Sequence, residues 1–125
     1  MRIFSIDEAN ALLAQVRPLL LSIKRGRGRL LTFSESANHA SAGAELGGGG
    51  MQDGARYVTI LMKIASDTTQ LDTLGVQLKD HERGLIDFPS LRDGRVVLLC
   101  WHLGDGDKIE WWHDVEAGFA GRQPI

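Results

Sequence analysis

Three stretches in the last third of the chain decide its fold: Gly84-Leu-Ile-Asp-Phe-Pro89, Arg95-Val-Val-Leu-Leu-Cys-Trp-His-Leu-Gly104 and Lys108-Ile-Glu-Trp-Trp-His-Asp114. They hold all three tryptophans, the only cysteine and two of the four histidines. Around them the hydrophobic pattern has a period near two, which is typical of β-strands. Turn signals such as Asp-Gly separate the stretches, so they predict antiparallel strands joined by short turns.

A short strand over Val76–Lys79 is predicted to precede these three. We expect turns at 80–84, 89–94 and 104–107. The stretch 95–103 is the longest and most apolar, so we place it at the centre of the sheet. The tail, 115–125, has no periodic pattern and is expected to be mostly irregular.

Two long helices are predicted upstream of the strands. Ser5 and Glu8 match a capping box, and apolar residues then recur at helical spacing, which predicts a helix to about Ala37. A second helix is predicted from about residue 53 to 74, ending at Gly75, a residue suited to the left-handed position after a helix. Two long helices in succession favour an antiparallel hairpin.

Several residues weaken or interrupt the first helix. Pro18 removes one backbone hydrogen bond, so we expect a kink there and no end of the helix. Gly26 and Gly28 each cost about 1 kcal/mol relative to alanine inside a helix. The segment 38–54 is glycine-rich and contains the run Gly47–Gly50, so it is predicted to be a flexible loop. The expected fold is α+β: a long antiparallel helical hairpin followed by a small antiparallel β-meander of three to four strands, in a single domain of 1–125.

Composition excludes several classes of function. A net charge of −2 and a pI near 6.0 give no global attraction to nucleic acid or to anionic lipid. A single cysteine excludes an internal disulfide framework and favours a reducing compartment. The N-terminus lacks the apolar run of a signal peptide, and no stretch approaches the roughly 20 apolar residues that span a bilayer. We therefore expect a cytoplasmic protein with no membrane contact.

The turn at Asp105-Gly106 predicts the register of the last hairpin. It places Cys100 opposite Trp111 and Leu98 opposite His113. Since side chains alternate across a sheet, one face is then predicted to carry six side chains: Leu98, Cys100, His102, Ile109, Trp111 and His113. On that face Cys100 and His113 are diagonal neighbours, close enough to share a ligand.

That grouping has two interpretations. The first is a metal or nucleophile site made by Cys100, His102 and His113, with Glu116 as a further ligand, because zinc takes thiolate and imidazole ligands. The second is an ordinary sheet face on which Cys100 packs as a small hydrophobic residue. The chain has no CxxC, HxxxH or HExxH spacing, so the second interpretation is favoured and we expect no cofactor.

Asp87 and the tryptophans are further candidates for ligand binding. Asp is disfavoured in mid-strand, so Asp87 is expected to point outward or to pair with a cation such as Arg95 or Arg122. The tryptophans, Trp101 among them, could line a ligand surface, although tryptophans in a small sheet more often belong to the core. The segment Lys24–Arg29 is the only dense basic cluster, and it favours a solvated helix face over nucleic-acid contact.

Several sequence motifs of the chain resemble those of one small bacterial family: Phe4-Ser-Ile-Asp-Glu-Ala-Asn-Ala-Leu-Leu13, Gly84–Pro89, Val97-Leu-Leu-Cys-Trp-His-Leu-Gly104, Trp112-His-Asp114 and Gly118-Phe-Ala-Gly-Arg122. The family is catalogued as domain of unknown function 2203. The resemblance covers nearly the whole chain and implies a cytoplasmic bacterial protein. It brings no established activity, cofactor or catalytic residue.

Two features depart from the family's pattern. One is the glycine-rich loop. The other is His102, because the resemblance implies a basic residue such as arginine at that position. A metal site that needs His102 is therefore disfavoured. His113 and Arg122 lie inside the matching motifs and Glu116 lies between the last two of them, so these three residues are better candidates for a site.

The leading hypothesis is a non-enzymatic module that oligomerises, as a dimer, or binds a partner. Ile60 and Leu74 lie off the apolar stripe that runs from Tyr57 to Leu71, so two helices on a small sheet leave apolar surface to cover. The alternative is a small enzyme or metal-binding protein. In it Arg122 holds an anion, and His113 acts as general base or ligand beside Glu116. A third hypothesis is weak nucleic-acid contact through Lys24–Arg29.

Overall fold

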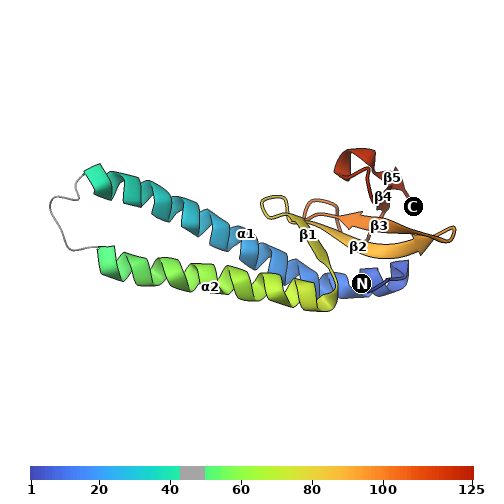
Figure 1. The fold of residues 1–125 in the computed structure, drawn as a ribbon, viewed down its shortest axis with the longest axis horizontal. Coiled ribbons are helices and arrows are strands. Elements are labelled where there is room, and N and C mark those ends of the chain that lie inside the picture. Colours follow the sequence, from blue (N-terminus) through green and yellow to red (C-terminus); the bar gives the residue numbers. More distant parts are fainter. Residues whose placement is uncertain (43–49) are drawn as a thin grey trace.

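The computed structural model of the chain describes residues 1–42 and 50–125 and has the predicted α+β architecture. Two long helices lie side by side and antiparallel, and a twisted sheet packs against the end of the hairpin that holds the N-terminus (Figure 1). The other end of the hairpin projects away from the sheet as a two-helix arm. In the described part of the chain, no helix has the length and apolar character to cross a membrane.

Helix α1, Ile6–Ala42, begins at the predicted capping box. The Ser5 hydroxyl accepts from the backbone N–H of Glu8 at 3.0 Å, and the Glu8 carboxylate accepts from the N–H of Ser5 at 3.0 Å. The bond from the Ser5 backbone lowers the pKa of Glu8 below its ordinary value. The helix continues through Pro18 and reaches Ala42, beyond the predicted end near Ala37, because residues 38–42 contain no glycine or proline to stop it.

Helix α2, Gly50–Leu74, starts earlier than predicted and ends where expected. Gly75 has φ 86°, a left-handed conformation that favours glycine. Of the glycine-rich segment predicted as a loop, residues 43–49 lie outside the described residues. The helices pack closely at Gly26, where an added Cβ would lie 2.7 Å from Cγ1 of Ile64.

The sheet has five antiparallel strands in the order β1-β2-β3-β4-β5, one more than the upper limit of the prediction. Their bounds are β1 Gln77–Asp80, β2 Leu85–Arg92, β3 Arg95–Trp101, β4 Trp111–Asp114 and β5 Gln123–Pro124. The longest apolar stretch, now β3, is central as predicted. The tail is more ordered than expected, because a short 3₁₀ turn η2, Phe119–Gly121, leads into β5, which pairs with β4.

The turn predicted over 89–94 is shorter in the structure. Strand β2 continues through Pro89, and only Asp93 and Gly94 form the turn, both with positive φ. Pro89 can lie in this strand because β1 pairs with β2 only as far as Asp87, so no ladder partner on that side needs a proline N–H. The N-terminal segment covers the open edge instead: the N–H of Phe4 donates to the Pro89 carbonyl at 2.7 Å.

The last predicted strand, 108–114, is only half correct. Its second half is β4, with the predicted pairs Cys100–Trp111 and Leu98–His113. Its first half leaves the ladder, because the backbone N–H of Ile109 donates to the Asn10 side chain of α1 at 2.7 Å. Ile109 therefore lies in the core between sheet and helix, and its predicted place on the Cys100 face is wrong.

The core lies between one face of the sheet and the first half of α1. The helix contributes side chains at a spacing of three or four residues, and the sheet contributes every second residue of β2 and β3. Its larger members are Leu13, Val16, Leu20, Ile23, Leu71, Ile86, Phe88, Leu99, Trp101 and Trp112. The alternate residues of β2, β3 and β4 point to the opposite, outer face of the sheet, and the candidate site lies there.

Candidate functional site

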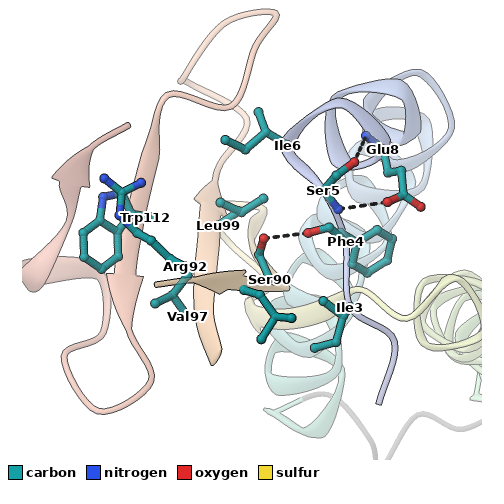
Figure 2. Close-up of a pocket in the computed structure, with 11 residues that line it drawn as sticks. Ile3, Phe4, Ser5, Ile6, Glu8, Ser90, Arg92, Val97, Leu99 and Trp112 are labelled. Atoms are coloured by element: carbon teal, nitrogen blue, oxygen red, sulfur yellow. Dashed lines mark hydrogen bonds between the residues drawn. The ribbon is translucent and has the colours of Figure 1, made fainter. Parts of the chain in front are cut away.

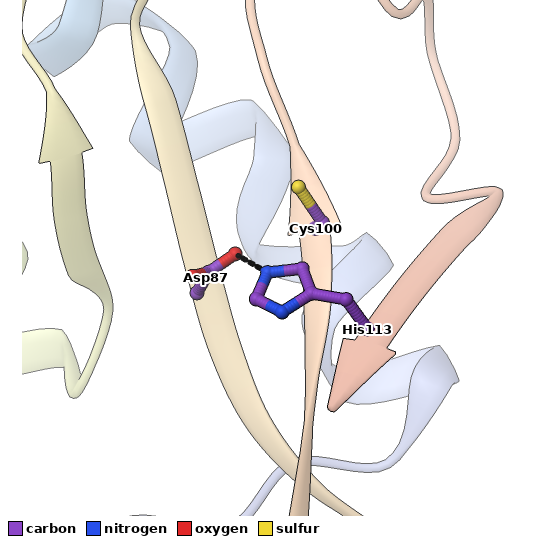
Figure 3. Close-up of side chains that lie close together, drawn as sticks. All are labelled: Asp87, Cys100 and His113. Carbon is purple, nitrogen blue, oxygen red and sulfur yellow. Dashed lines mark hydrogen bonds and ion pairs between the residues drawn. The ribbon is translucent and has the colours of Figure 1, made fainter. Parts of the chain in front are cut away.

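Three neighbouring strands each place one polar side chain on the outer face of the sheet: Asp87 on β2, Cys100 on β3 and His113 on β4 (Figure 3). Asp87 lies directly opposite Cys100, and Cys100 lies opposite Trp111, two residues from His113. One ligand atom from each of the three side chains lies within 4.8 Å of the other two. All three residues are buried, with at most 3% of any of them exposed.

The two nitrogens of His113 face different partners. Nδ1 lies 2.8 Å from the backbone carbonyl of Asp114, and Nε2 lies 3.1 Å from Oδ1 of Asp87. A carbonyl oxygen can only accept, so Nδ1 must carry a proton and donate. In a neutral ring Nε2 then presents a lone pair to a carboxylate oxygen. A cation must lie between these two atoms, either a proton or a metal ion.

Cys100 is a poor nucleophile in this setting. Its side chain is fully buried, and burial raises the pKa of the thiol from 9.0 to about 12, with a further rise from the Asp87 carboxylate and a partly opposing effect from Arg122. A thiol with a raised pKa stays protonated at neutral pH and lacks the thiolate that attacks a substrate. The geometry therefore disfavours nucleophilic catalysis at Cys100.

A second polar network lies beside the first and joins the loop after β3 to the tail. The carboxylate of Asp105 binds Arg122, His102 Nε2 at 3.0 Å and the backbone N–H of His102 at 3.1 Å. His102 Nδ1 accepts from the backbone N–H of Gly104 at 3.0 Å. Both nitrogens of His102 thus have complementary partners in the neutral ring, which leaves no lone pair for a metal ion.

Arg122 is held by aromatic rings as well as by Asp105. Its guanidinium carbon lies 4.9 Å from the centre of the Trp111 ring and 4.7 Å from that of Phe119. These contacts anchor the tail to the outer face of the sheet. The Nε of Arg122 is buried without a hydrogen-bond partner.

The structure brings only some of the predicted residues together. His113 lies beside Asp87 and Cys100, whereas Arg122 binds Asp105. Glu116 is exposed, and among the described residues no side-chain hydrogen bond or ion pair involves it. Trp101 is fully buried in the core, where its indole N–H donates to the Gly106 carbonyl at 3.1 Å, so it lines no ligand surface.

Asp87 points to the outer face of the sheet, but its expected surroundings are wrong. The side chain is neither exposed nor paired with an arginine, because Arg95 binds Asp114 at 3.1 Å and Arg122 binds Asp105. Its partner is His113, and the sequence held the signal for this pairing. A two-residue turn at Asp93-Gly94 pairs Arg92 with Arg95, and counting back along the hairpin places Asp87 opposite Cys100.

A shallow groove of about 420 Å³ lies on the other side of the sheet, between β2 and the segment that precedes α1 (Figure 2). The capping residues Ser5 and Glu8 face one another at one wall, and Val97, Leu99 and Trp112 contribute side chains from the sheet. The groove is mainly apolar, and the hydroxyl of Ser90 already donates to the Phe4 carbonyl at 2.6 Å.

The arm carries an apolar surface that the described part of the chain covers only at its edge. On α2, Ile60, Ile64 and Leu71 face α1. Tyr57 and Leu61 lie at the edge of this stripe, where the Tyr57 ring lies 6.2 Å from the Phe33 ring of α1 between centres. Val58 and Met62 lie farther round the helix, next to Leu61. We call these four residues the arm face. Their exposed fractions are 38%, 52%, 41% and 67%.

The basic cluster lies on α1 of the same arm. Lys24, Arg25, Arg27 and Arg29 are exposed, as expected for a solvated helix face. Near the tip of the arm, Arg29 and Arg56 line a second shallow cavity, of about 580 Å³, between the two helices. The basic cluster has no interleaved aromatic residues of the kind that bind unpaired bases, and the cavity has one aromatic residue in its lining, Phe33.

Comparison with known proteins gives one match. The model of a family described as an uncharacterized conserved protein, DUF2203, matches residues 2–125. No curated protein and no solved structure matches the chain.

Proposed function

The chain belongs to the DUF2203 family of uncharacterized conserved proteins, and we propose that it is a non-enzymatic module that forms a homodimer through the arm face. The observation that carries this proposal is the second apolar face of α2. Four large apolar side chains on adjacent turns of this helix are each more than a third exposed. Contiguous apolar surface of this kind on a soluble protein marks an interaction site.

A second copy of the chain is the occupant that the architecture favours. Two helices alone bury only one stripe of each helix, whereas two hairpins packed together form a four-helix bundle, a common and stable arrangement. A two-fold axis through the arm face lets the same four residues meet themselves, as in most homodimers. The free arm offers room for such packing, because it projects beyond the sheet (Figure 1).

Charge favours an antiparallel pairing of the two arms. Residues 75–125, which include the sheet, carry nine acidic and six basic side chains. Antiparallel arms keep these two acidic regions at opposite ends of the dimer, whereas parallel arms bring them together. The contact also involves α2 of each copy, so the exposed basic cluster of α1 stays at the side of the bundle.

The alternative functions have less support. An enzyme site at His113, Glu116 and Arg122 needs three side chains that share one accessible cavity, and here His113 and Arg122 are engaged with different partners. Nucleic-acid contact rests on the basic cluster alone. The buried free thiol of Cys100 is compatible with a reducing, cytoplasmic location in a bacterium.

Light scattering over a concentration series tests the proposal. The wild-type protein is expected to have twice the chain mass of 13.7 kDa, and a Leu61→Glu/Met62→Glu variant is expected to have the mass of one chain. Gln70→Glu adds a charge at an exposed position of α2 off the arm face and should remain a dimer. A wild-type protein that is monomeric at every concentration overturns the proposal.

A further inference from the structure

Asp87, Cys100 and His113 have the composition of a metal site. They offer a carboxylate oxygen, a sulfur and an imidazole nitrogen, which are the three ligand types that zinc takes from proteins. They come from three adjacent strands, so the sheet fixes their relative positions without any loop. Sites built on strands hold their ligands in place better than sites built on loops.

The distances are close to those of a coordination sphere. In a tetrahedral zinc site, ligand atoms about 2.0–2.3 Å from the metal are separated from each other by roughly 3.3–3.8 Å. His113 Nε2 and Asp87 Oδ1 are 3.1 Å apart, and all three ligand atoms lie within 4.8 Å of one another.

The hydrogen bonding of His113 supports the same conclusion. Histidines that bind a metal through one nitrogen usually donate the other N–H to a carbonyl or carboxylate. His113 Nδ1 donates to the Asp114 carbonyl, and its Nε2 lone pair points toward Asp87 (Figure 3). His102, by contrast, uses both nitrogens within its own network.

We propose that Asp87, Cys100 and His113 together bind one divalent transition-metal ion, with Zn²⁺ the best suited to the donor set. The carboxylate of Asp87 can supply either one or two oxygens, so the three side chains offer three or four donor atoms. Binding displaces the proton of the Cys100 thiol and the proton held between His113 and Asp87, and the metal takes their place. This site differs from the one expected from sequence, since Asp87 replaces His102.

The metal ion is expected to raise the folding stability of the protein. All three residues are buried, which leaves a substrate no approach to the ion. The ion would tie β2, β3 and β4 together on the outer face of the sheet, and binding energy available only in the folded state adds to folding stability. The inference does not depend on the proposed dimer, because the site and the arm face share no residue.

Cobalt binding tests the site directly. Purified protein is treated with chelator and titrated with Co²⁺. A cysteine ligand is expected to give the near-ultraviolet charge-transfer band of a cobalt–thiolate bond, saturating at one ion per chain. Zn²⁺ is then expected to remove the band by displacement. The same protein isolated without chelator should contain one metal ion per chain by elemental analysis.

Variants assign the ligands. Cys100→Ser should lose the charge-transfer band. His113→Gln should weaken Co²⁺ binding by at least about tenfold, because loss of even a hydrogen-bond partner behind a ligand weakens metal binding by that much. His81→Gln and His102→Gln are matched controls and should bind Co²⁺ as the wild type does. Circular dichroism of each variant separates a lost ligand from a lost fold. Cys100→Ala serves as the second variant, because a small apolar residue can fill that buried position.

Two results would overturn the proposal. One is a wild-type protein that gives no charge-transfer band at saturating Co²⁺. The other is a folded His113→Gln variant that binds Co²⁺ as tightly as the wild type does. Either result leaves the His113–Asp87 contact as a proton-bridged pair that only stabilises the sheet.

Discussion

At the scale of single residues, the most buried polar contact on the outer face of the sheet is the pair of Asp87 and His113. Asp87 and His113 are each less than 5% exposed, so neither can recover its lost hydration from water if its partner is removed. An exposed pair of the same sheet, Arg95 and Asp114, lies at an equal distance of 3.1 Å. The two pairs have the same separation and differ in burial, so they allow a buried pair to be compared with an exposed one.

Asp87→Ala is expected to lower the free energy of unfolding by about 3 kcal/mol or more, because it leaves the His113 ring buried and unpaired. Asp114→Ala, which breaks the exposed pair, should cost less than about 1 kcal/mol. Urea denaturation followed by circular dichroism measures both values. Equal losses in the two variants would contradict the importance that we give to burial.

Cys100 is expected to react slowly with thiol reagents in the folded protein after treatment with chelator. Its sulfur is inaccessible, and its pKa of about 12 keeps the thiol protonated as the pH rises through 9.0, the ordinary value, so the rate should stay low across that range. Thiol modification in native and denaturing buffer measures the difference. An added exposed thiol, Thr69→Cys, is the positive control. Rapid modification of Cys100 before unfolding would show that the outer face opens readily.

At the scale of elements, the start of α1 depends on the capping box. Ser5→Ala is expected to cost about 1 kcal/mol, the usual value for a lost N-cap. Glu8 adds a dependence on pH. Its pKa is lowered in the folded state, so its contribution is complete above its ordinary value of 4.5 and is lost as the pH falls through the folded value. Thermal unfolding should therefore separate wild type from Glu8→Gln near neutral pH but not in strong acid.

Two glycines of α1 make a matched pair. Gly28 has no atom within 4 Å of an added Cβ, so Gly28→Ala should stabilise the protein by about 1 kcal/mol through helix propensity alone. At Gly26 the added carbon would meet Ile64 at 2.7 Å, so Gly26→Ala should gain less than this or lose stability. Equal stabilisation by both substitutions, measured by urea denaturation, would show that the helices do not pack closely there.

The elements themselves were largely predictable from sequence. The capping box, Gly75 and the change of period after it located both helices and the order of the strands. The limits of β2 and β4 were not predictable, because they depend on tertiary contacts. Phe4 covers the edge of β2 at Pro89, and the Asn10 side chain accepts a hydrogen bond from the N–H of Ile109. Neither contact leaves a local signal in the strand that it changes.

At the scale of the whole molecule, the candidate site was only partly predictable. The register of the last hairpin correctly brought Cys100 and His113 onto one face. Asp87 was named as a candidate but was not grouped with Cys100 and His113, because the turn before β3 was placed too early. His102 was included because Asp105, its partner, was read as part of a turn. The residues of the arm face were not foreseen. Ile60 and Leu74, expected to leave apolar surface, pack against α1 and the core, whereas Tyr57 and Leu61 of the expected stripe are exposed.

The central claim is that two copies of the chain meet through the arm face, and cysteine cross-linking at Leu61 tests it most directly. A two-fold axis at this face places residue 61 of one copy beside residue 61 of the other, and the wild-type Cys100 is buried, so the new thiol reacts alone. Under mild oxidation Leu61→Cys should give a covalent dimer of twice 13.7 kDa, whereas Gln70→Cys should remain a single chain. Failure of Leu61→Cys to cross-link, or equal cross-linking at both positions, would contradict the account.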